Sequence, residues 1–76
     1  MNASDLEELV LIPKNRVGAL IGEEGKTKKL IQNKTKTRIK IDSKTGEITL
    51  EAEQKHSEKF QKALSIVKAI GRGFSP

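Results

Sequence analysis

The sequence predicts a single α+β domain whose elements follow the order β-α-α-β-β-α. Three observations carry this prediction. Two segments, 37–42 and 47–53, alternate apolar and polar residues around a turn, as a β-hairpin does. The C-terminal third carries one apolar stripe at helical spacing. Two shorter helical segments precede the hairpin, and a pair of glycines separates them.

The first two elements are predicted from the N-terminal quarter of the chain. "EELVLIP" (7–13) is apolar toward its end and is interpreted as a strand that Pro13 stops. "KNRVGALI" (14–21) is predicted to be a short helix, with Asn15 as its N-cap. Its apolar side contains Val17, Leu20 and Ile21, at positions i, i+3 and i+4.

Glycines end the first helix, and a lysine-rich segment follows. Gly22 and Gly25 interrupt the helical pattern, after which "KTKKLIQNKTK" (26–36) is predicted to be a second helix. Leu30 and Ile31 form its apolar side, and lysines form its polar side.

The remaining elements are a hairpin and a long helix. In "TRIKID" (37–42) the isoleucines are predicted to face inward, and "SKTG" (43–46) is a turn by composition. "EITLEAE" (47–53) alternates again and completes the hairpin. The last helix has Gly71 in place to end it. Its predicted stripe consists of Phe60, Ala63, Leu64, Val67 and Ile70.

Composition allows one small aliphatic core and no cysteine chemistry. The 76 residues include 18 Leu, Ile and Val and no Cys, so neither a disulfide nor a Cys-based zinc site supplements the core. No apolar run approaches the roughly 20 residues of a membrane span, and no signal peptide opens the chain. We therefore expect a protein of the cytoplasm (of the nucleolus if the source is eukaryotic), with no membrane association and monomeric in isolation.

The positive charge is concentrated around the glycine pair. The net charge is +5, but residues 14–44 carry ten Lys or Arg against three acids, whereas residues 1–13 carry three acids and no base. Such a basic block suits a polyanion, whose phosphates it would neutralise. The alternative is that the lysines serve only solubility.

The stretch "LIGEEGKT" (20–27) has the glycines and the lysine of a phosphate-binding loop. Its ligand would be either a nucleotide or the backbone of a nucleic acid. A Walker A loop needs a glycine five residues before the Gly of Gly-Lys-Thr, and that position is Leu20. The chain is also too short for the doubly wound sheet that such a loop serves. Both observations argue against a nucleotide-binding P-loop and favour a loop that grips a nucleic-acid backbone.

The element order and the loop together resemble a type I KH domain, a small RNA- or single-stranded-DNA-binding module. The resemblance rests on "LIGEEGKTKKLIQNKT", which places a G-x-x-G loop between two short helices, and it covers nearly the whole chain. It implies a three-stranded antiparallel sheet covered on one face by three helices. "IPKNRVGALIGEEGKTKKLI", "IDSKTGEITL" and "AIGRGFSP" further resemble the first KH repeat of the archaeal and eukaryotic partner-of-Nob (Krr-related) proteins of small-subunit ribosome assembly.

The resemblance also implies domain boundaries. Residues 1–8 would form an N-terminal acidic segment, and residues 9–72 the KH domain. Residues 73–76 would be a tail that begins the linker to a second KH repeat.

The resemblance implies where RNA binds. Gly22 and Gly25 let the backbone approach about four nucleotides, and the N–H groups that open the second helix suit phosphate oxygens. Lysines around the helix start would hold phosphates. Val17, Ile21, Ile31 and Ile39 would form the groove floor, with Arg38 and Lys40 on its other side. The predicted RNA-binding residues are Arg16, Val17, Ile21, Gly22, Glu23, Glu24, Gly25, Lys26, Lys28, Lys29, Ile31, Arg38, Ile39 and Lys40.

The two variable loop positions are acidic, which leaves two functions open. Glu23 and Glu24 gain from the helix macrodipole but repel incoming phosphates. The first hypothesis is a module for single-stranded RNA, in particular rRNA during small-subunit assembly. The alternative is a KH-fold scaffold that binds a ribosome-assembly or translation-factor protein and little or no RNA. No catalytic set, metal site or cofactor is predicted, because His56 is the single histidine and the carboxylates form no catalytic pair.

Overall fold

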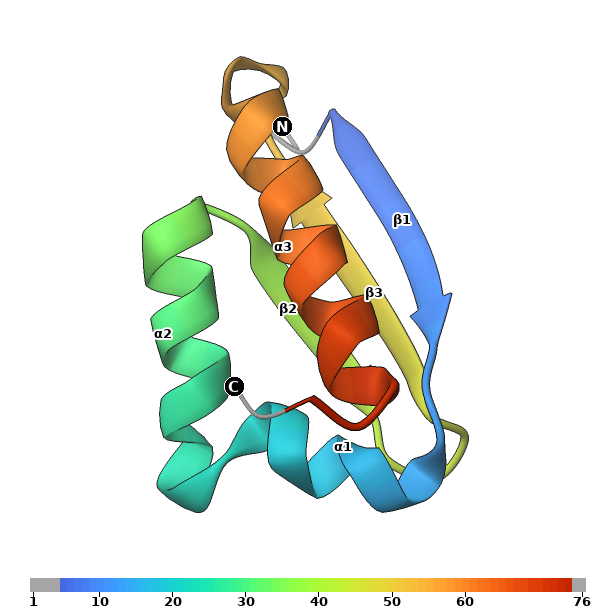
Figure 1. Ribbon diagram of the computed structural model, residues 1–76. Coiled ribbons are helices and arrows are strands. Elements are labelled where there is room, and N and C mark those ends of the chain that lie inside the picture. Colours follow the sequence, from blue (N-terminus) through green and yellow to red (C-terminus); the bar gives the residue numbers. More distant parts are fainter. Residues whose placement is uncertain (1–4, 75–76) are drawn as a thin grey trace.

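The computed structural model describes residues 5–74 and has the predicted β-α-α-β-β-α order (Figure 1). Single 3₁₀ turns lie at Glu23–Gly25, in the glycine loop, and at Gln54–His56, before the last helix. The main elements are β1 (Leu6–Leu11), α1 (Lys14–Ile21), α2 (Lys26–Thr35), β2 (Arg38–Asp42), β3 (Glu47–Ala52) and α3 (Ser57–Gly71).

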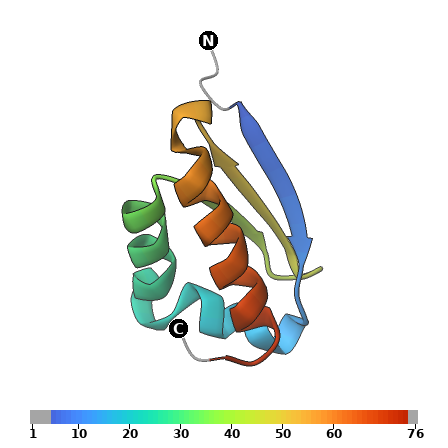
Figure 2. The ribbon, with the colours of Figure 1, turned by 45° about the horizontal axis from the view of Figure 1, so that its top comes forward.

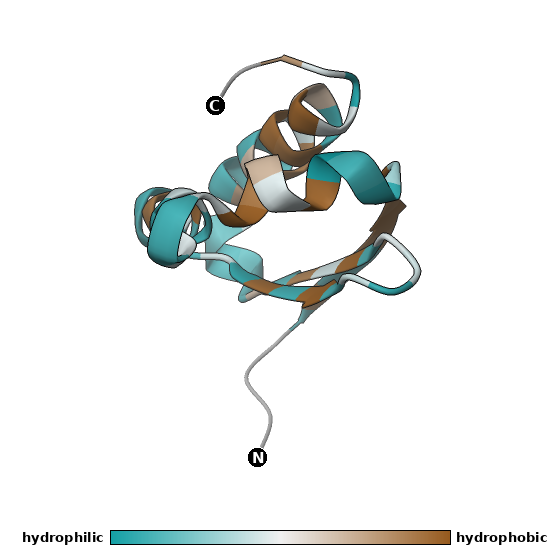
Figure 3. Ribbon diagram, turned by 90° about the horizontal axis from the view of Figure 1, so that it is seen from below, coloured by the Kyte–Doolittle hydropathy of each residue, from teal (hydrophilic) through white to brown (hydrophobic). Residues whose placement is uncertain are grey.

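The three strands form one antiparallel sheet in the order β1-β3-β2, and the three helices cover one of its faces (Figure 2). Ile48 in the central strand lies opposite Val10 in β1 and Ile41 in β2, so apolar residues of all three strands share one face. Seen end-on, the helices all lie on the same side of this sheet (Figure 3). The type I arrangement predicted from the sequence is therefore confirmed.

The core lies between the sheet and α3. The whole predicted stripe of α3 is buried, and Phe60, Ala63 and Val67 are at most 2% exposed. Leu20 of α1 and Ile31 of α2 complete the core from the other two helices. Among residues 5–74, every helix is too short or too polar to cross a lipid bilayer.

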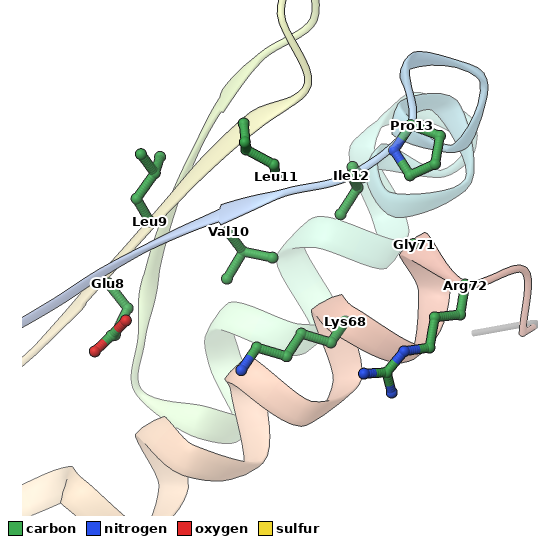
Figure 4. Close-up of a pocket in the computed structure, with 9 residues that line it drawn as sticks. All are labelled: Glu8, Leu9, Val10, Leu11, Ile12, Pro13, Lys68, Gly71 and Arg72. Carbon is green, nitrogen blue, oxygen red and sulfur yellow. The ribbon is translucent and has the colours of Figure 1, made fainter.

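Strand β1 shows the alternation that makes the sheet two-faced (Figure 4). Val10 is buried and points toward α3, whereas Leu9 and Leu11 point to the uncovered face and are 56% and 68% exposed. The strand begins at Leu6, one residue before the predicted start, and ends at Leu11 rather than Pro13.

Two details of the predicted helices are wrong. Asn15 does not cap α1: the helix begins at Lys14, Pro13 occupies the N-cap position, and no side chain caps it. Leu30 does not join Ile31 in the core, because it is 54% exposed. Adjacent residues on a helix point about 100° apart, so only one of the two can face the sheet directly.

Helix α3 ends at Gly71, as the sequence predicts, but Gly73 rather than Gly71 has the left-handed backbone, and the role of Gly71 is close packing. A Cβ at Gly71 would lie 2.6 Å from Cγ2 of Ile12. The chain leaves the helix through Gly73, whose φ is +106°. The N–H of Gly73 donates to the carbonyl of Ile70 at 3.0 Å and that of Phe74 to the carbonyl of Ala69 at 3.1 Å, which is a Schellman motif.

Gly18 and Gly71 provide a matched test of this packing, because both lie inside helices. We expect Gly71→Ala to lower the free energy of unfolding by about 1–3 kcal/mol, since its methyl group collides with Ile12. Gly18→Ala should raise it by about 0.5–1 kcal/mol, because a Cβ there meets nothing within 4 Å and alanine favours the helix. Urea unfolding of the two variants measures both changes, and equal signs would refute the packing role of Gly71.

Candidate nucleic-acid interface

The glycine loop leaves α1 through a backbone conformation that only glycine adopts readily. Gly22 has φ +75° and ψ 172°, and its N–H donates to the carbonyl of Gly18 at 2.9 Å. A Cβ at this position would overlap the Oγ1 of Thr27 in the first turn of α2. Gly22 therefore lets the end of α1 and the start of α2 approach closely.

The next residues form a left-handed turn. Glu24 has φ +56° and Gly25 has φ +77°, and the N–H of Gly25 donates to the carbonyl of Gly22 at 3.1 Å. A left-handed backbone costs a non-glycine residue about 1–2 kcal/mol. Glu24 is thus both charged and strained at the exposed tip of the loop.

Helix α2 starts without a side-chain cap. Its N-cap is Gly25, which offers no side chain, and its first turn contains no acid. The N-terminal N–H groups of a helix carry partial positive charge and suit an anion. Lys26, Lys28 and Lys29 follow directly in the first turn.

A groove opens beside the loop, between α2 and the edge strand β2. It has a volume of about 360 Å³, and lysine stems, isoleucines and polar groups share its walls. Its lining residues are Ile21, Gly25, Lys28, Lys29, Gln32, Ile41 and Ser43.

Gln32 joins the two walls of this groove. Its Oε1 accepts a hydrogen bond of 2.8 Å from the N–H of Ile39, on the outer edge of β2. Alternate residues of a strand direct their backbone groups to the same side, so the N–H and C=O of Ile41 also point to this edge. The groove therefore presents a strand edge opposite the basic helix.

The groove floor differs from the prediction. Val17, Ile31 and Ile39 are at most 5% exposed and belong to the core, so they support the groove from below without lining it. Of the predicted floor, Ile21 lines the groove, and Ile41 accompanies it. The sequence pattern identified the inward-facing residues but not which of them lie at the margin of the core.

Arg38 and Lys40 do not border the groove. They alternate with Ile39 and Ile41 along β2 and so extend to the uncovered face of the sheet. There the carboxylate of Glu51 lies 3.3 Å from Arg38 Nη2 and 3.4 Å from Lys40 Nζ. The Glu51 side chain is only 11% exposed, and the two cations neutralise it.

Arg16 is also engaged elsewhere. Its Nε donates to the carbonyl of Ile70 at 2.8 Å, and its Nη2 to that of Phe74 at 3.1 Å. Arg16 thus connects α1 to the end of α3, which is a structural role. The sequence analysis predicted only that Arg16 binds RNA.

Three lining residues were missed by the sequence prediction: Gln32, Ile41 and Ser43. Helical spacing was sufficient to place Gln32 on the same side of the helix as the loop, since Gln32 lies one turn after Lys28 and two turns after Gly25. Ile41 repeats the period of Ile39 along β2. Ser43 has no comparable signal, because its place depends on how the hairpin turn leaves the sheet.

A second hollow, of about 490 Å³, lies far from the loop, between β1 and the end of α3 (Figure 4). Glu8, Lys68 and Arg72 lie around its opening, with Val10 and Ile12 on the wall formed by β1. It combines acid with base and has no glycine loop, so it lacks the uniform basic wall of the α2 groove. Within residues 5–74, no group of three His, Asp or Glu side chains is arranged to hold a metal ion.

The fold and the G-x-x-G loop define a type I KH domain. The KH domain family profile matches residues 7–66, and the chain belongs to this family. KH domains are nucleic-acid-binding modules whose G-x-x-G loop clamps the nucleic-acid backbone.

Three relatives resemble the chain closely. The KH domain-containing protein MJ0443 of Methanocaldococcus jannaschii is 42% identical over 71 residues, which is 91% of this chain and 31% of that protein. The crystal structure of Dim2p from Pyrococcus horikoshii has a TM-score of 0.89 at 50% identity, over 95% of this chain and 45% of the other. A complex of a/eIF2alpha, aDim2p and rRNA from the same organism contains a chain with a TM-score of 0.87 at 51% identity, over 93% and 41%. The chain therefore spans less than half the length of each of these relatives.

The two loop glycines should differ in what they tolerate. Gly25→Asn should change the free energy of unfolding by less than about 1 kcal/mol, because asparagine accepts the left-handed region and the nearest atom to a Cβ is Lys29 Cε at 3.9 Å. Gly22→Ala should cost about 1–3 kcal/mol or displace the loop, because its conformation and the Thr27 contact both exclude a side chain. Urea unfolding together with amide shifts of residues 20–28 distinguishes the two, and a harmless Gly22→Ala would refute this geometry.

Proposed function

We propose that this domain binds single-stranded RNA of about four nucleotides in the groove between α2 and β2. The observation that carries the proposal is the meeting of three features at one place. A left-handed glycine loop opens onto the groove, lysines of the first turn of α2 line one wall, and the outer edge of strand β2 forms the other. Each feature matches a different part of a nucleotide.

The phosphates would lie at the loop and the start of α2. Gly22 and Gly25 keep side chains away from the backbone there. No side chain caps α2, so its first-turn N–H groups provide donors, apart from that of Lys26, which bonds to the carbonyl of Glu23. Lys28 and Lys29 lie on the groove side of the helix and add charge. This arrangement suits a flexible backbone that bends over the loop.

The bases would lie deeper, over Ile21 and Ile41. Aliphatic side chains contact base faces through dispersion, while the N–H and C=O of Ile41 and the amide of Gln32 offer hydrogen bonds to base edges. A duplex keeps its bases paired and stacked, so we expect the groove to hold unpaired bases rather than a duplex.

The comparison with known structures supports ribosomal RNA as the class of RNA that is bound. One similar structure is a complex of aDim2p with rRNA, and on this basis we extend the proposal to rRNA during assembly of the small subunit. A role in the cytoplasm (or nucleolus) as a monomeric module is the corresponding proposal for location and state.

A protein-binding scaffold is the second candidate, and the acidic loop favours it. Glu23 and Glu24 are exposed at the loop tip, and each repels a phosphate by about 1 kcal/mol at about 4 Å in water. The complex that contains aDim2p and rRNA also contains a/eIF2alpha, which makes a translation-factor partner a reasonable proposal.

Titration of short single-stranded RNAs into ¹⁵N-labelled protein tests the first candidate. We expect amide shifts concentrated in residues 20–43 and an affinity that falls with salt. The logarithmic slope should be about −0.7 per phosphate contacted, for two to four contacts. The matching duplex should bind less well. If the amides of residues 20–43 do not shift and the affinity does not depend on salt, the result favours the scaffold function.

Replacement of the loop acids tests their effect on RNA. Glu23→Lys with Glu24→Gly should bind RNA about five- to thirty-fold more tightly at low salt, a gain that shrinks as salt screens the loop. Glycine is placed at position 24 because it also relieves the left-handed strain.

A charge-matched control separates the loop from net charge. Glu7→Lys with Glu8→Gln changes the net charge equally, but in β1, remote from the groove. We expect it to alter affinity less than twofold at physiological salt. If the folded loop variant, checked by circular dichroism, gains no more than this control, the loop does not meet phosphate.

A further inference from the structure

A second groove, between α2 and α3, lies outside the RNA site. Figure 1 and Figure 2 show these two helices side by side on the outer surface. The groove has a volume of about 340 Å³, within the range of ligand pockets, and its walls are largely aliphatic. Its lining residues are Thr27, Leu30, Ile31, Lys34, Thr35, Ile66, Ala69 and Ile70.

Two large apolar side chains at this groove remain accessible. Leu30 is 54% exposed and Ile66 is 37% exposed, one on each helix. Both side chains lie on helices that already pack into the core through other residues. The exposed apolar surface of Leu30 and Ile66 is therefore available to another protein.

Helix α2 divides its residues between the two grooves. Lys28, Lys29 and Gln32 line the RNA groove, whereas Thr27, Leu30 and Lys34 line the groove beside α3. Residues three and four apart share one side of a helix, so the two sets occupy different sides. A ligand in one groove need not displace a ligand in the other.

The charged side chain in the wall of the second groove is basic. Helices α2 and α3 carry seven lysines and one acid, Glu58, although Lys28 and Lys29 line the RNA groove and Lys68 lines the hollow beside β1. Within the described part of the chain, none of these lysines forms an ion pair with a carboxylate, since the ion pairs there involve Arg38, Lys40 and Lys55. Lys34 lies in the groove wall, and Lys62 precedes Ile66 by about one turn of α3.

We propose that this groove binds an amphipathic, acidic helical segment of a protein partner. Apolar residues at i, i+3 or i+4 of the partner would insert between Leu30 and Ile66, and its flanking carboxylates would meet Lys34 and Lys62. The chemistry disfavours RNA as the occupant. The walls are helices whose backbone groups are bonded internally, and they contain no aromatic or arginine side chain on which a base could stack.

A phage-displayed library of random 16-residue amphipathic helices, panned on the whole chain, tests the proposal. We expect selected peptides to be rich in Asp and Glu beside Leu, Ile or Phe. Titrated into ¹⁵N-labelled protein, they should shift the amides of Thr27, Leu30, Lys34, Ile66 and Ala69. They should also bind when the RNA groove is occupied by a short single-stranded RNA.

Exposed positions supply variants that keep the fold. Leu30→Ser or Ile66→Ser should weaken the selected peptides about tenfold, as loss of a central apolar contact does. Leu11→Ser, a leucine of similar exposure on the uncovered sheet face, should change affinity less than twofold. Lys34→Glu with Lys62→Glu should also weaken binding about tenfold, whereas Lys44→Glu in the hairpin turn should not.

Several results would overturn the proposal. The first is that the library enriches no peptide or enriches basic peptides. The second is that the selected peptides shift amides elsewhere in the domain. The third is that Leu11→Ser and Leu30→Ser weaken peptide affinity equally. The RNA outcome is separate: if single-stranded RNA rather than peptide shifts the Ile66 and Ala69 amides of α3, the groove is a nucleic-acid surface. Because these two amides lie outside residues 20–43, where RNA in the α2–β2 groove is expected to act, this readout stands independently of the proposed function.

Discussion

The position of Ile12 constrains the rest of this small domain. Its N–H donates to the carbonyl of Gly46 at 2.9 Å, and its side chain packs against Gly71. A Cβ on either glycine would collide with Ile12. The connection from β1 to α1 therefore passes between the hairpin turn and the end of α3 only because both neighbours lack side chains. Arg16, in α1, secures the same junction by donating to the carbonyls of Ile70, near the end of α3, and of Phe74, beyond it.

The direction of α1 in turn places the glycine loop. Gly22 ends α1 and contacts Thr27, so the start of α2 follows from the end of α1. The far end of α2 is held to β2 by Gln32, whose side chain bonds to Ile39 and whose carbonyl accepts the N–H of Thr37 at 3.3 Å. These contacts hold both ends of α2 against its neighbours, so the groove between α2 and β2 is already formed in the fold.

The sequence was sufficient for what depends on neighbours along the chain. Alternation and helical spacing predicted the six elements, their order and the glycine loop. They did not predict that Arg38 and Lys40 meet Glu51, because that pairing depends on the register of β2 against β3. They also missed Arg16, whose partners lie 54 and 58 residues away. Leu30 was misassigned, and the packing of Gly71 against Ile12 was missed, for a related reason: spacing marks a helical face but not what packs against it.

At the proposed RNA site, the acidic loop would change how the binding free energy is divided between phosphates and bases. Phosphate contacts position a nucleic acid but carry no base information, whereas contacts to base edges distinguish sequences. In the proposed complex, Glu23 and Glu24 would weaken the phosphate contacts and would not affect contacts to Ile21, Gln32 and Ile41. A larger fraction of the remaining binding free energy would then come from the bases. We therefore expect a domain that binds RNA more weakly than one with a basic loop, and that depends more on the identity of the bases it holds.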